Sequence, residues 1–218
     1  MTGRVLRADW DAPPGIEAGT ITMLGDDTDL PAEPLLLKQV HGNAVVSLAA
    51  LRAAAEPLKA DAVTGDKPGD LCVVQTADCL PLLMVTRDGS EIAAAHAGWR
   101  GLAAGVVENT IAALRAPASG VLVWLGPAIS VAAFEVGDEV REAFTHHDEA
   151  AASHFTRNAR GRWQADLYGL ARQRLAAAGV TNISGGGMCT YLDRERFYSY
   201  RRDPGCGRLL SFVYRRGA

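Results

Sequence analysis

The chain has few cysteines and histidines for its length, and basic residues are not in excess. Its 218 residues include 4 cysteines and 5 histidines, and 22 lysines and arginines stand against 25 aspartates and glutamates. Four cysteines in a chain this long do not make a disulfide scaffold, so each thiol stays open for metal binding or catalysis. A protein that mainly holds a nucleic acid backbone usually has a basic surplus, so the net charge of −3 argues against nucleic acid as a partner.

Long apolar runs are also missing. None approaches the roughly 18 residues of a membrane-spanning helix. The chain begins with MTGRVLRADWDAPPG, which lacks the apolar segment of a signal peptide. We therefore expect a cytoplasmic protein that does not contact a membrane and that is a monomer or a small homo-oligomer.

Short apolar segments are instead mixed with segments of helical period. With 48% hydrophobic residues and no Pro/Ser/Gly-rich linker, the composition favours one catalytic domain over residues 1–218. The mixed order of elements favours an α+β fold over a doubly wound sheet. Strands are predicted at 35–40, 71–76, 80–86, 92–96, 121–125, near 198–201 and at 209–214, and helices at 48–55, 102–115, 137–145 and 167–178. Asp166 is predicted to cap the last helix and Gly179 to end it.

Two histidines and one cysteine lie where predicted strands end. His41 and His96 each follow an apolar segment and precede a glycine, and Cys79 stands at a strand edge before Pro81. Two imidazoles and a thiolate make a three-ligand zinc set with an open position, and zinc would lower the pKa of a bound water to roughly 7. Two other interpretations remain open at this point. Cys79 could be a nucleophile with His96 as its base, or the histidines could be packing residues.

The remaining histidines stand in a polar, acidic stretch. We interpret His146, His147 and His154 as a solvated helix end, because no thiolate lies near them in the sequence. The glycine run 185–187 lacks the frame of a phosphate-binding loop, so we predict a flexible turn there.

Several arginines are candidates for anion contacts. Arg100 opens a predicted helix, where free backbone N–H groups favour anions, and Arg201 and Arg202 follow an aromatic run. Guanidinium groups suit phosphate or carboxylate, although ordinary surface charge explains any single arginine equally well. The aromatic run 197–200 could stack on a base or form a half-buried strand.

Six motifs in order resemble a known family over nearly the whole chain, from about Leu35 to the C-terminus. They are Lys38-Gln39-Val40-His41-Gly42, Ala60-Asp61-Ala62-Val63-Thr64, Thr76-Ala77-Asp78-Cys79-Leu80-Pro81, His96-Ala97-Gly98-Trp99-Arg100-Gly101, Gly126-Pro127 with Phe134-Glu135-Val136-Gly137, and Cys189-Thr190 with residues 197–202. This order is similar to that of the laccase-domain family, also called the multicopper polyphenol oxidoreductase family. Its members are described as purine nucleoside phosphorylases with adenosine deaminase and methylthioadenosine phosphorylase activity, and one bacterial branch as peptidoglycan editing factor.

The resemblance implies a set of site residues. It makes His41, Cys79 and His96 the metal ligands, with zinc as the metal and copper also possible. It further implies Arg100 as an anion contact. Catalytic roles are expected for Cys79, His96, Asp78 and Arg100, and substrate binding is expected for Gln75, Arg100 and Arg201. The fold it implies is a layered α/β/β/α arrangement of the α+β class with mixed sheets.

One departure from the family pattern stands near the C-terminus. A Thr-Gly-Arg sequence is expected there, and this chain has Cys206-Gly207-Arg208. If the missing hydroxyl contacts ligand, the departure affects substrate preference and leaves the metal site intact.

The expected function is that of a zinc-dependent enzyme acting on purine nucleosides and phosphate. Phosphorolysis would use Arg100 and Arg201 to hold phosphate against C1′ of the ribose. Deamination would use a metal-activated water at C6 of adenine, with Asp78 or another carboxylate moving protons. The alternative is a metal- or Cys79-dependent hydrolase that edits serine-containing peptidoglycan precursors. A copper phenol oxidase is disfavoured because five histidines are few for several copper sites, and a non-catalytic binding module because an open metal site usually does chemistry.

Overall fold

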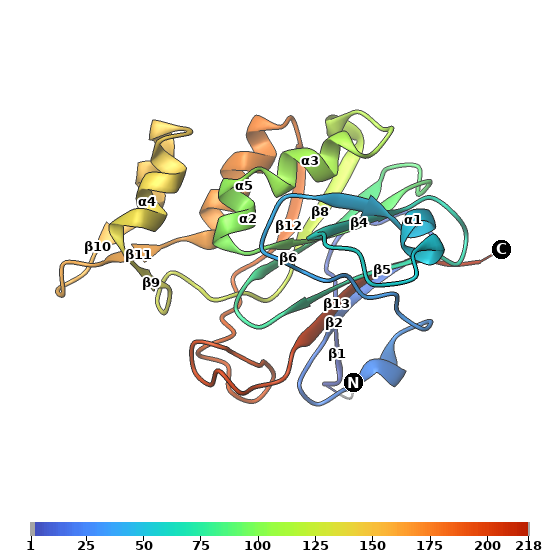
Figure 1. Ribbon diagram of the computed structural model, residues 1–218, viewed down its shortest axis with the longest axis horizontal. Coiled ribbons are helices and arrows are strands. Elements are labelled where there is room, and N and C mark those ends of the chain that lie inside the picture. The colour runs from blue at the N-terminus through green and yellow to red at the C-terminus, as the bar shows by residue number, and fades with distance from the viewer. Residues whose placement is uncertain (1–2, 218) are drawn as a thin grey trace.

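Two large sheets and one small sheet organise the chain in the computed structural model, which describes residues 3–217 (Figure 1). The six-stranded sheet has the order β12-β8-β6-β7-β4-β3, and its strands are β3 (Val45–Ser47), β4 (Ala62–Gly65), β6 (Leu80–Thr86), β7 (Ile92–Ala97), β8 (Val121–Leu125) and β12 (Asn182–Gly185). The four-stranded sheet has the order β1-β2-β13-β5, with β1 (Val5–Arg7), β2 (Ile16–Ile21), β5 (Leu71–Thr76) and β13 (Leu209–Arg215). The small sheet joins β10 (Phe155–Arg157), β11 (Trp163–Ala165) and β9 (Glu135–Val136).

Helices are short and flank the sheets. They are α1 (Leu48–Ala53), α2 (Trp99–Ala103), α3 (Val106–Ala112), α4 (Asp138–Thr145) and α5 (Leu167–Ala177), with 3-10 turns η1 (Asp27–Asp29), η2 (Ala118–Gly120) and η3 (Glu149–His154). Figure 1 shows α2, α3 and α5 over one side of the six-stranded sheet and β13, β2 and β1 on its other side. The small sheet and α4 extend away from these layers.

The alternation of side chains along β6 builds the layers. Leu82 and Met84 pack in the core under the helices, whereas Leu83 and Val85 pack against the four-stranded sheet. All four are fully buried, which is why this segment reads as a continuous apolar run rather than as an alternating one. The far side of the four-stranded sheet buries Phe212 with the segment that follows η1. The predicted α+β class with mixed sheets is confirmed.

Most of the predicted elements are present, and three predictions were wrong. Residues 35–40 form only an isolated bridge between Lys38 and Lys59, because the next backbone N–H groups bond to a carboxylate instead of a strand. Residues 198–201 are not a strand, since the Arg201 N–H donates to Asp78. The predicted helix 102–115 is two helices, α2 and α3, because Gly105 takes a left-handed φ of 96° between them. Asp166 does cap α5.

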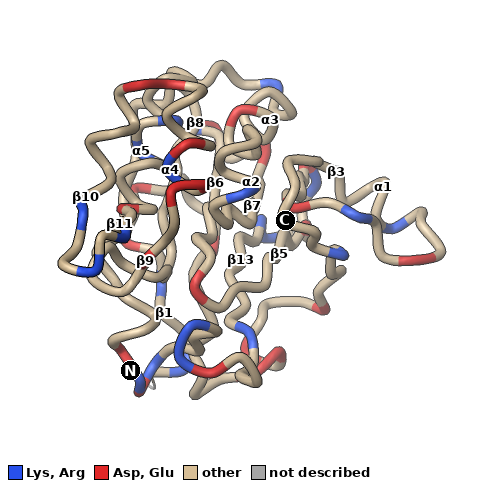
Figure 2. Tube along the Cα trace, turned by 60° about the vertical axis from the view of Figure 1, so that its left-hand side comes forward, with Lys and Arg blue, Asp and Glu red and all other residues tan. Residues whose placement is uncertain are grey.

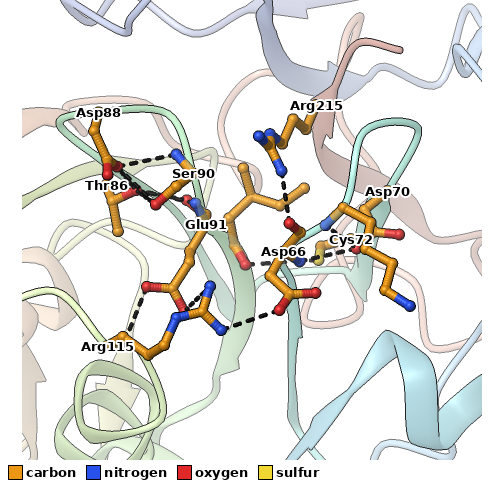
Figure 3. A network of polar contacts seen from close by, with 11 residues as sticks. Asp66, Asp70, Cys72, Thr86, Asp88, Ser90, Glu91, Arg115 and Arg215 are labelled. Atoms are coloured by element: carbon orange, nitrogen blue, oxygen red, sulfur yellow. Dashed lines mark hydrogen bonds and ion pairs between the residues drawn. The ribbon is translucent and has the colours of Figure 1, made fainter. Parts of the chain in front are cut away.

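Buried carboxylates fix the ends of β5 and β7 that lie opposite the site described below. Asp70 accepts from Arg52 at 2.7 Å. It also accepts from the N–H groups of Asp66 and Lys67, in the network that Figure 3 shows around Asp66 and Asp70. Glu91 accepts from the backbone N–H of Arg115 at 3.0 Å. Both carboxylates are nearly fully buried and both are paired, as buried charges must be. The network therefore anchors the strands that run towards the site.

Charges of both signs are distributed along the whole chain. Figure 2 shows basic and acidic positions interspersed, with basic positions on β10 and at the tip of the β10–β11 hairpin. Within residues 3–217, no helix has the length and apolar character needed to cross a membrane.

Candidate metal centre

The predicted ligands meet at one end of the six-stranded sheet. His96 lies in β7, Cys79 directly precedes β6, and His41 stands in the loop before β3. Their ligand atoms all lie within 4.8 Å of one another, and the two imidazole rings stand 4.8 Å apart at 78°. The structure thus brings together three residues that are far apart in the sequence.

The backbone around the centre is strained. His41 has a φ of 59° and Asp78, next to Cys79, a φ of 87°, a left-handed conformation that is uncommon for residues other than glycine. Gly98 packs against both ligands, because a Cβ there would lie 2.9 Å from the Cys79 sulfur and 3.2 Å from the His41 ring. Strain and close packing together hold the ligand side chains in one arrangement.

Asp61 supports both histidines from beneath. Its carboxylate is fully buried and contacts Nδ1 of His96 at 2.8 Å. It also accepts from the backbone N–H groups of Val40, His41 and Gly42 at 3.2, 2.9 and 2.7 Å. Four contacts to one carboxylate fix the ring of His96 and the loop that carries His41. A carboxylate behind a histidine is the usual outer shell of a metal site, since it sets the tautomer and leaves the other ring nitrogen for the metal.

The donor set fits a divalent transition metal. Imidazole and thiolate are the ligands of zinc and also suit copper, and three protein ligands leave a position open. His41 is exposed, Cys79 is half-buried and His96 is buried, so the open side of the set faces the cleft described below.

Cys79 and His96 shift one another's titration. Burial acts to raise the pKa of the Cys79 thiol, but hydrogen bonds to His41 and His96 outweigh burial and lower the pKa to about 7. Burial acts to lower the pKa of His96, but its contacts with Asp61 and Cys79 raise the pKa to about 9. Without metal, the site between pH 7 and 9 is therefore a thiolate beside an imidazolium.

Metal affinity should consequently depend on pH. A bound metal must displace the proton that the Cys79–His96 pair holds, so the affinity for Zn²⁺ is expected to rise about tenfold or more per pH unit between pH 7 and 9, and more steeply where a metal-bound water also ionises. Competition with a chromophoric chelator at fixed ionic strength measures the slope. Calorimetry in two buffers of different ionisation enthalpy should count at least one released proton in this range. An affinity that does not change with pH would contradict the thiolate–imidazolium pair.

A cleft of about 670 Å³ opens over the centre. We call it the metal cleft, and its lining includes His41, Cys79 and His96 together with Arg100, Arg201 and Arg208. Arg100 stacks on Trp99 at 4.4 Å, and Arg201 donates to the backbone carbonyls of Ala133 and Glu135. Three guanidinium groups beside a three-ligand centre suit an anion held next to a metal.

Two further predicted residues line the metal cleft. The backbone of Gln75 is fixed by the side chain of Gln39, which donates to its carbonyl and accepts from its N–H, both at 2.8 Å. The Gln75 side-chain amide has no hydrogen-bond partner within the described chain. The carboxylate of Asp78 is already engaged, since it accepts from the Thr190 hydroxyl at 2.6 Å and from the Arg201 N–H at 2.7 Å.

Other predicted residues lie outside the cleft lining. Of the aromatic run 197–200, only Tyr200 reaches the cleft, while Phe197 is fully buried. Arg202 donates to backbone carbonyls and holds its own loop. Cys206, which stands where the family pattern has threonine, is absent from the lining, although its neighbour Arg208 is present. His146 and His147 are exposed at the end of α4, as predicted.

Sequence reasoning missed Asp61 and Gln39 as supporting residues. For Asp61 a signal existed, because a carboxylate inside the apolar segment Ala60–Val63 must be paired if the segment is buried. No comparable signal marks Gln39, whose role depends on a strand that lies far away in the sequence.

Comparisons with known proteins agree with this architecture. A family model described as multi-copper polyphenol oxidoreductase laccase matches residues 16–216. A relative from Escherichia coli K12 named purine nucleoside phosphorylase YfiH is 50% identical over 186 residues, which cover 85% of this chain and 75% of the relative. A Pseudomonas aeruginosa relative, also named a purine nucleoside phosphorylase, is 52% identical with the same coverage.

Solved structures show the same fold. The crystal structure of a Neisseria meningitidis protein superposes with a TM-score of 0.90 at 39% identity, over 98% of this chain and 100% of that one. The YlmD protein of Geobacillus stearothermophilus superposes with a TM-score of 0.78 at 25% identity, over 93% of each chain. With the family model covering nearly all of its length, this chain belongs to the multi-copper polyphenol oxidoreductase laccase family.

Proposed function

We propose that this protein is a zinc-dependent purine nucleoside enzyme that cleaves adenosine, inosine or methylthioadenosine by phosphorolysis and deaminates adenosine. The observation that carries the proposal is the convergence of His41, Cys79 and His96 with three arginines in one cleft of small-molecule size. The names of the relatives, which are purine nucleoside phosphorylases, support the substrate class.

The three ligands would hold the metal through two imidazoles and one thiolate. A zinc ion there would supply Lewis acidity and lower the pKa of water to about 7, the chemistry on which deamination depends. Asp61 orients His96 for this role through the contact at Nδ1.

Phosphorolysis would depend on the arginines. In this reaction a phosphate oxygen bonds to C1′ of the ribose while the bond from C1′ to the purine nitrogen breaks. Arg100 is exposed in the metal cleft and has no ion-pair partner among residues 3–217, so its charge is available to phosphate. Arg201 is held by two backbone carbonyls, which fixes its direction before a ligand binds. Fixed positive charge next to the attacking group is how an enzyme accelerates such a transfer.

The remaining cleft residues would position the nucleoside. The free amide of Gln75 can donate to and accept from a purine edge, and the exposed ring of Tyr200 offers a stacking surface. For Asp78 we propose a positioning role instead of proton transfer, because both carboxylate oxygens already accept hydrogen bonds. It ties the loop that carries Arg201 to the turn that carries Cys79.

One observation favours a second candidate, a hydrolase that edits serine-containing peptidoglycan precursors. The lowered pKa of Cys79, about 7, next to the protonated His96 resembles an activated thiolate nucleophile. A copper phenol oxidase with several metals has less support. Within residues 3–217, His41, Cys79 and His96 form the single group of three or more His, Cys, Asp or Glu residues able to hold a metal ion.

Product chromatography tests the proposal. Zinc-loaded protein incubated with adenosine is expected to release adenine only when phosphate is present, and inosine with or without phosphate. Removing zinc with a chelator should stop both, and adding zinc back should restore them. Activity that survives chelation but is lost when Cys79 is alkylated would favour the thiolate mechanism. If no product forms with or without phosphate, the nucleoside proposal is wrong, and a serine-bearing muropeptide precursor is the next substrate to try.

A further inference from the structure

A second hollow adjoins the metal cleft. We call it the outer chamber; it has a volume of about 300 Å³. Trp99, Arg100, Phe134 and Arg201 line both spaces, so the two adjoin at these four side chains. The chamber's remaining wall comes from β9, the start of α4 and the β10–β11 hairpin, which lie together at one end of the molecule (Figure 1).

The charges of the outer chamber favour an anion. Three arginines line it, namely Arg100, Arg162 and Arg201, against two glutamates. One glutamate, Glu135, is neutralised by Arg160 at 2.6 Å, which leaves Glu139 as the opposing carboxylate. The chamber therefore keeps a surplus of positive charge. Figure 2 shows basic positions at the tip of the β10–β11 hairpin, which forms part of the chamber wall.

Arg162 is the cation that belongs to the outer chamber alone. It directly precedes β11, is exposed, and does not line the metal cleft. In the part of the chain that the structure describes, its guanidinium has neither a hydrogen-bond nor an ion-pair partner. The neighbouring Arg157 and Arg160 are paired with Asp138 and Glu135. Of the arginines on this hairpin, the one that faces the chamber is thus the one left without a partner.

We propose that the outer chamber is a phosphate subsite, with Arg162 as its specific contact. The inference rests on the proposed function and deepens it by naming a substrate class: a purine nucleoside that carries a phosphate on its 5′ oxygen. With the purine at the metal and C1′ beside Arg100 and Arg201, the 5′ end is the part of the ligand farthest from the centre, and the outer chamber adjoins the cleft at these same two arginines. Free inorganic phosphate offers the same chemistry and is the other source of such a group.

Calorimetric binding to the zinc-loaded protein tests the subsite without requiring turnover. The probes are inosine, inosine 5′-monophosphate and inorganic phosphate, each titrated alone so that neither proposed reaction can proceed. Arg162→Ala is expected to weaken binding of the monophosphate about tenfold or more while inosine binds as before, because one charge-assisted contact is lost. Glu139→Gln should tighten the monophosphate, since it removes the opposing carboxylate. Arg194→Ala is the matched control, because this exposed arginine has no partner within residues 3–217 and lies outside both spaces.

The probes separate the two sources and the two proposals. If Arg162→Ala lowers the affinity for the monophosphate, the subsite binds a phosphorylated nucleoside. If it lowers the affinity for inorganic phosphate alone, the subsite binds the free ion. If Arg162→Ala weakens binding of neither by more than Arg194→Ala does, the subsite is refuted, whatever the result with inosine. If neither inosine nor the monophosphate binds while binding of inorganic phosphate is still weakened by Arg162→Ala, the nucleoside function fails and the phosphate subsite stands.

Discussion

Replacing His41 with alanine is expected to abolish zinc binding and, with it, both proposed activities. The variant loses one of three protein ligands, so the fall in affinity should exceed the roughly 10- to 100-fold loss that is typical when only an outer-shell partner is removed. His41 is exposed, and its substitution therefore removes little packing from the core. The loss should be one of metal binding rather than of folding.

Metal content after dialysis and the rate of product formation measure this effect. His146→Ala is the matched control, since that histidine is exposed and stands apart from the centre. His41→Asn controls for a change in backbone conformation at this position, because asparagine tolerates the left-handed conformation that His41 adopts. It should lose zinc as His41→Ala does. Full activity in a zinc-free His41→Ala protein would end the metal-dependent interpretation.

Replacing Asp61 with asparagine is expected to cost both metal affinity and stability. The carboxylate accepts from three backbone N–H groups and contacts His96. In asparagine one of the two oxygens becomes an NH₂ group, which cannot accept hydrogen bonds, so some of these N–H groups would lose their acceptor. Zinc affinity should fall about 10- to 100-fold, the range for an outer-shell partner. The free energy of unfolding should fall by roughly 1–3 kcal/mol, the cost of leaving buried donors unpaired.

The pH dependence of the free energy of unfolding distinguishes the contribution of the Asp61 charge from that of its side-chain shape. Burial acts to raise the pKa of Asp61, but hydrogen bonds from His96, Gly42 and Val40 lower it below the usual value. A carboxyl whose pKa is lower in the folded state stabilises the protein above its unfolded pKa of about 3.9, and this contribution is lost as the pH falls further. In urea titrations of metal-free protein, the difference between wild type and Asp61→Asn should therefore shrink below about pH 4. Asp27→Asn, an exposed carboxylate in η1, is the control. A difference that stays constant with pH would assign the effect to shape alone.

The strongly apolar strands could be predicted from the sequence, and the more polar ones could not. β6 and β5 are short apolar runs because both of their faces are buried, and this leaves a plain signal. β2 has the sequence IEAGTI, in which a glycine and polar residues hide the strand, and β12 reads NISG. Such strands form because their neighbours in the sheet supply hydrogen bonds and packing, which local propensity does not record.

The metal ligands required more than spacing. His41, Cys79 and His96 form no compact motif, so their positions at predicted strand ends left a metal site as one of three interpretations, and the resemblance to a family favoured it. The Asp78 carboxylate accepts hydrogen bonds from Thr190 and Arg201, which lie 112 and 123 residues further along the chain. No local sequence pattern predicts contacts between residues so far apart. Nothing in the sequence indicated the position of Arg162 either, because its place in the outer chamber depends on how the β10–β11 hairpin packs.

The position of β13 also governs the order in which the protein can assemble during synthesis. β13 lies between β2 and β5, and the hydroxyls of Thr20 and Ser211 meet at 2.8 Å across 191 residues of chain. The four-stranded sheet therefore closes only after β13 has left the ribosome. The segment that carries Arg201 and Arg208 directly precedes β13. These two arginines therefore join the lining of the metal cleft only at about the time that the four-stranded sheet closes. The candidate metal ligands His41, Cys79 and His96 are synthesised earlier, so the Cys79 thiol exists before the segment that later lines the cleft beside it. A metal bound at that stage would protect the thiolate from oxidation.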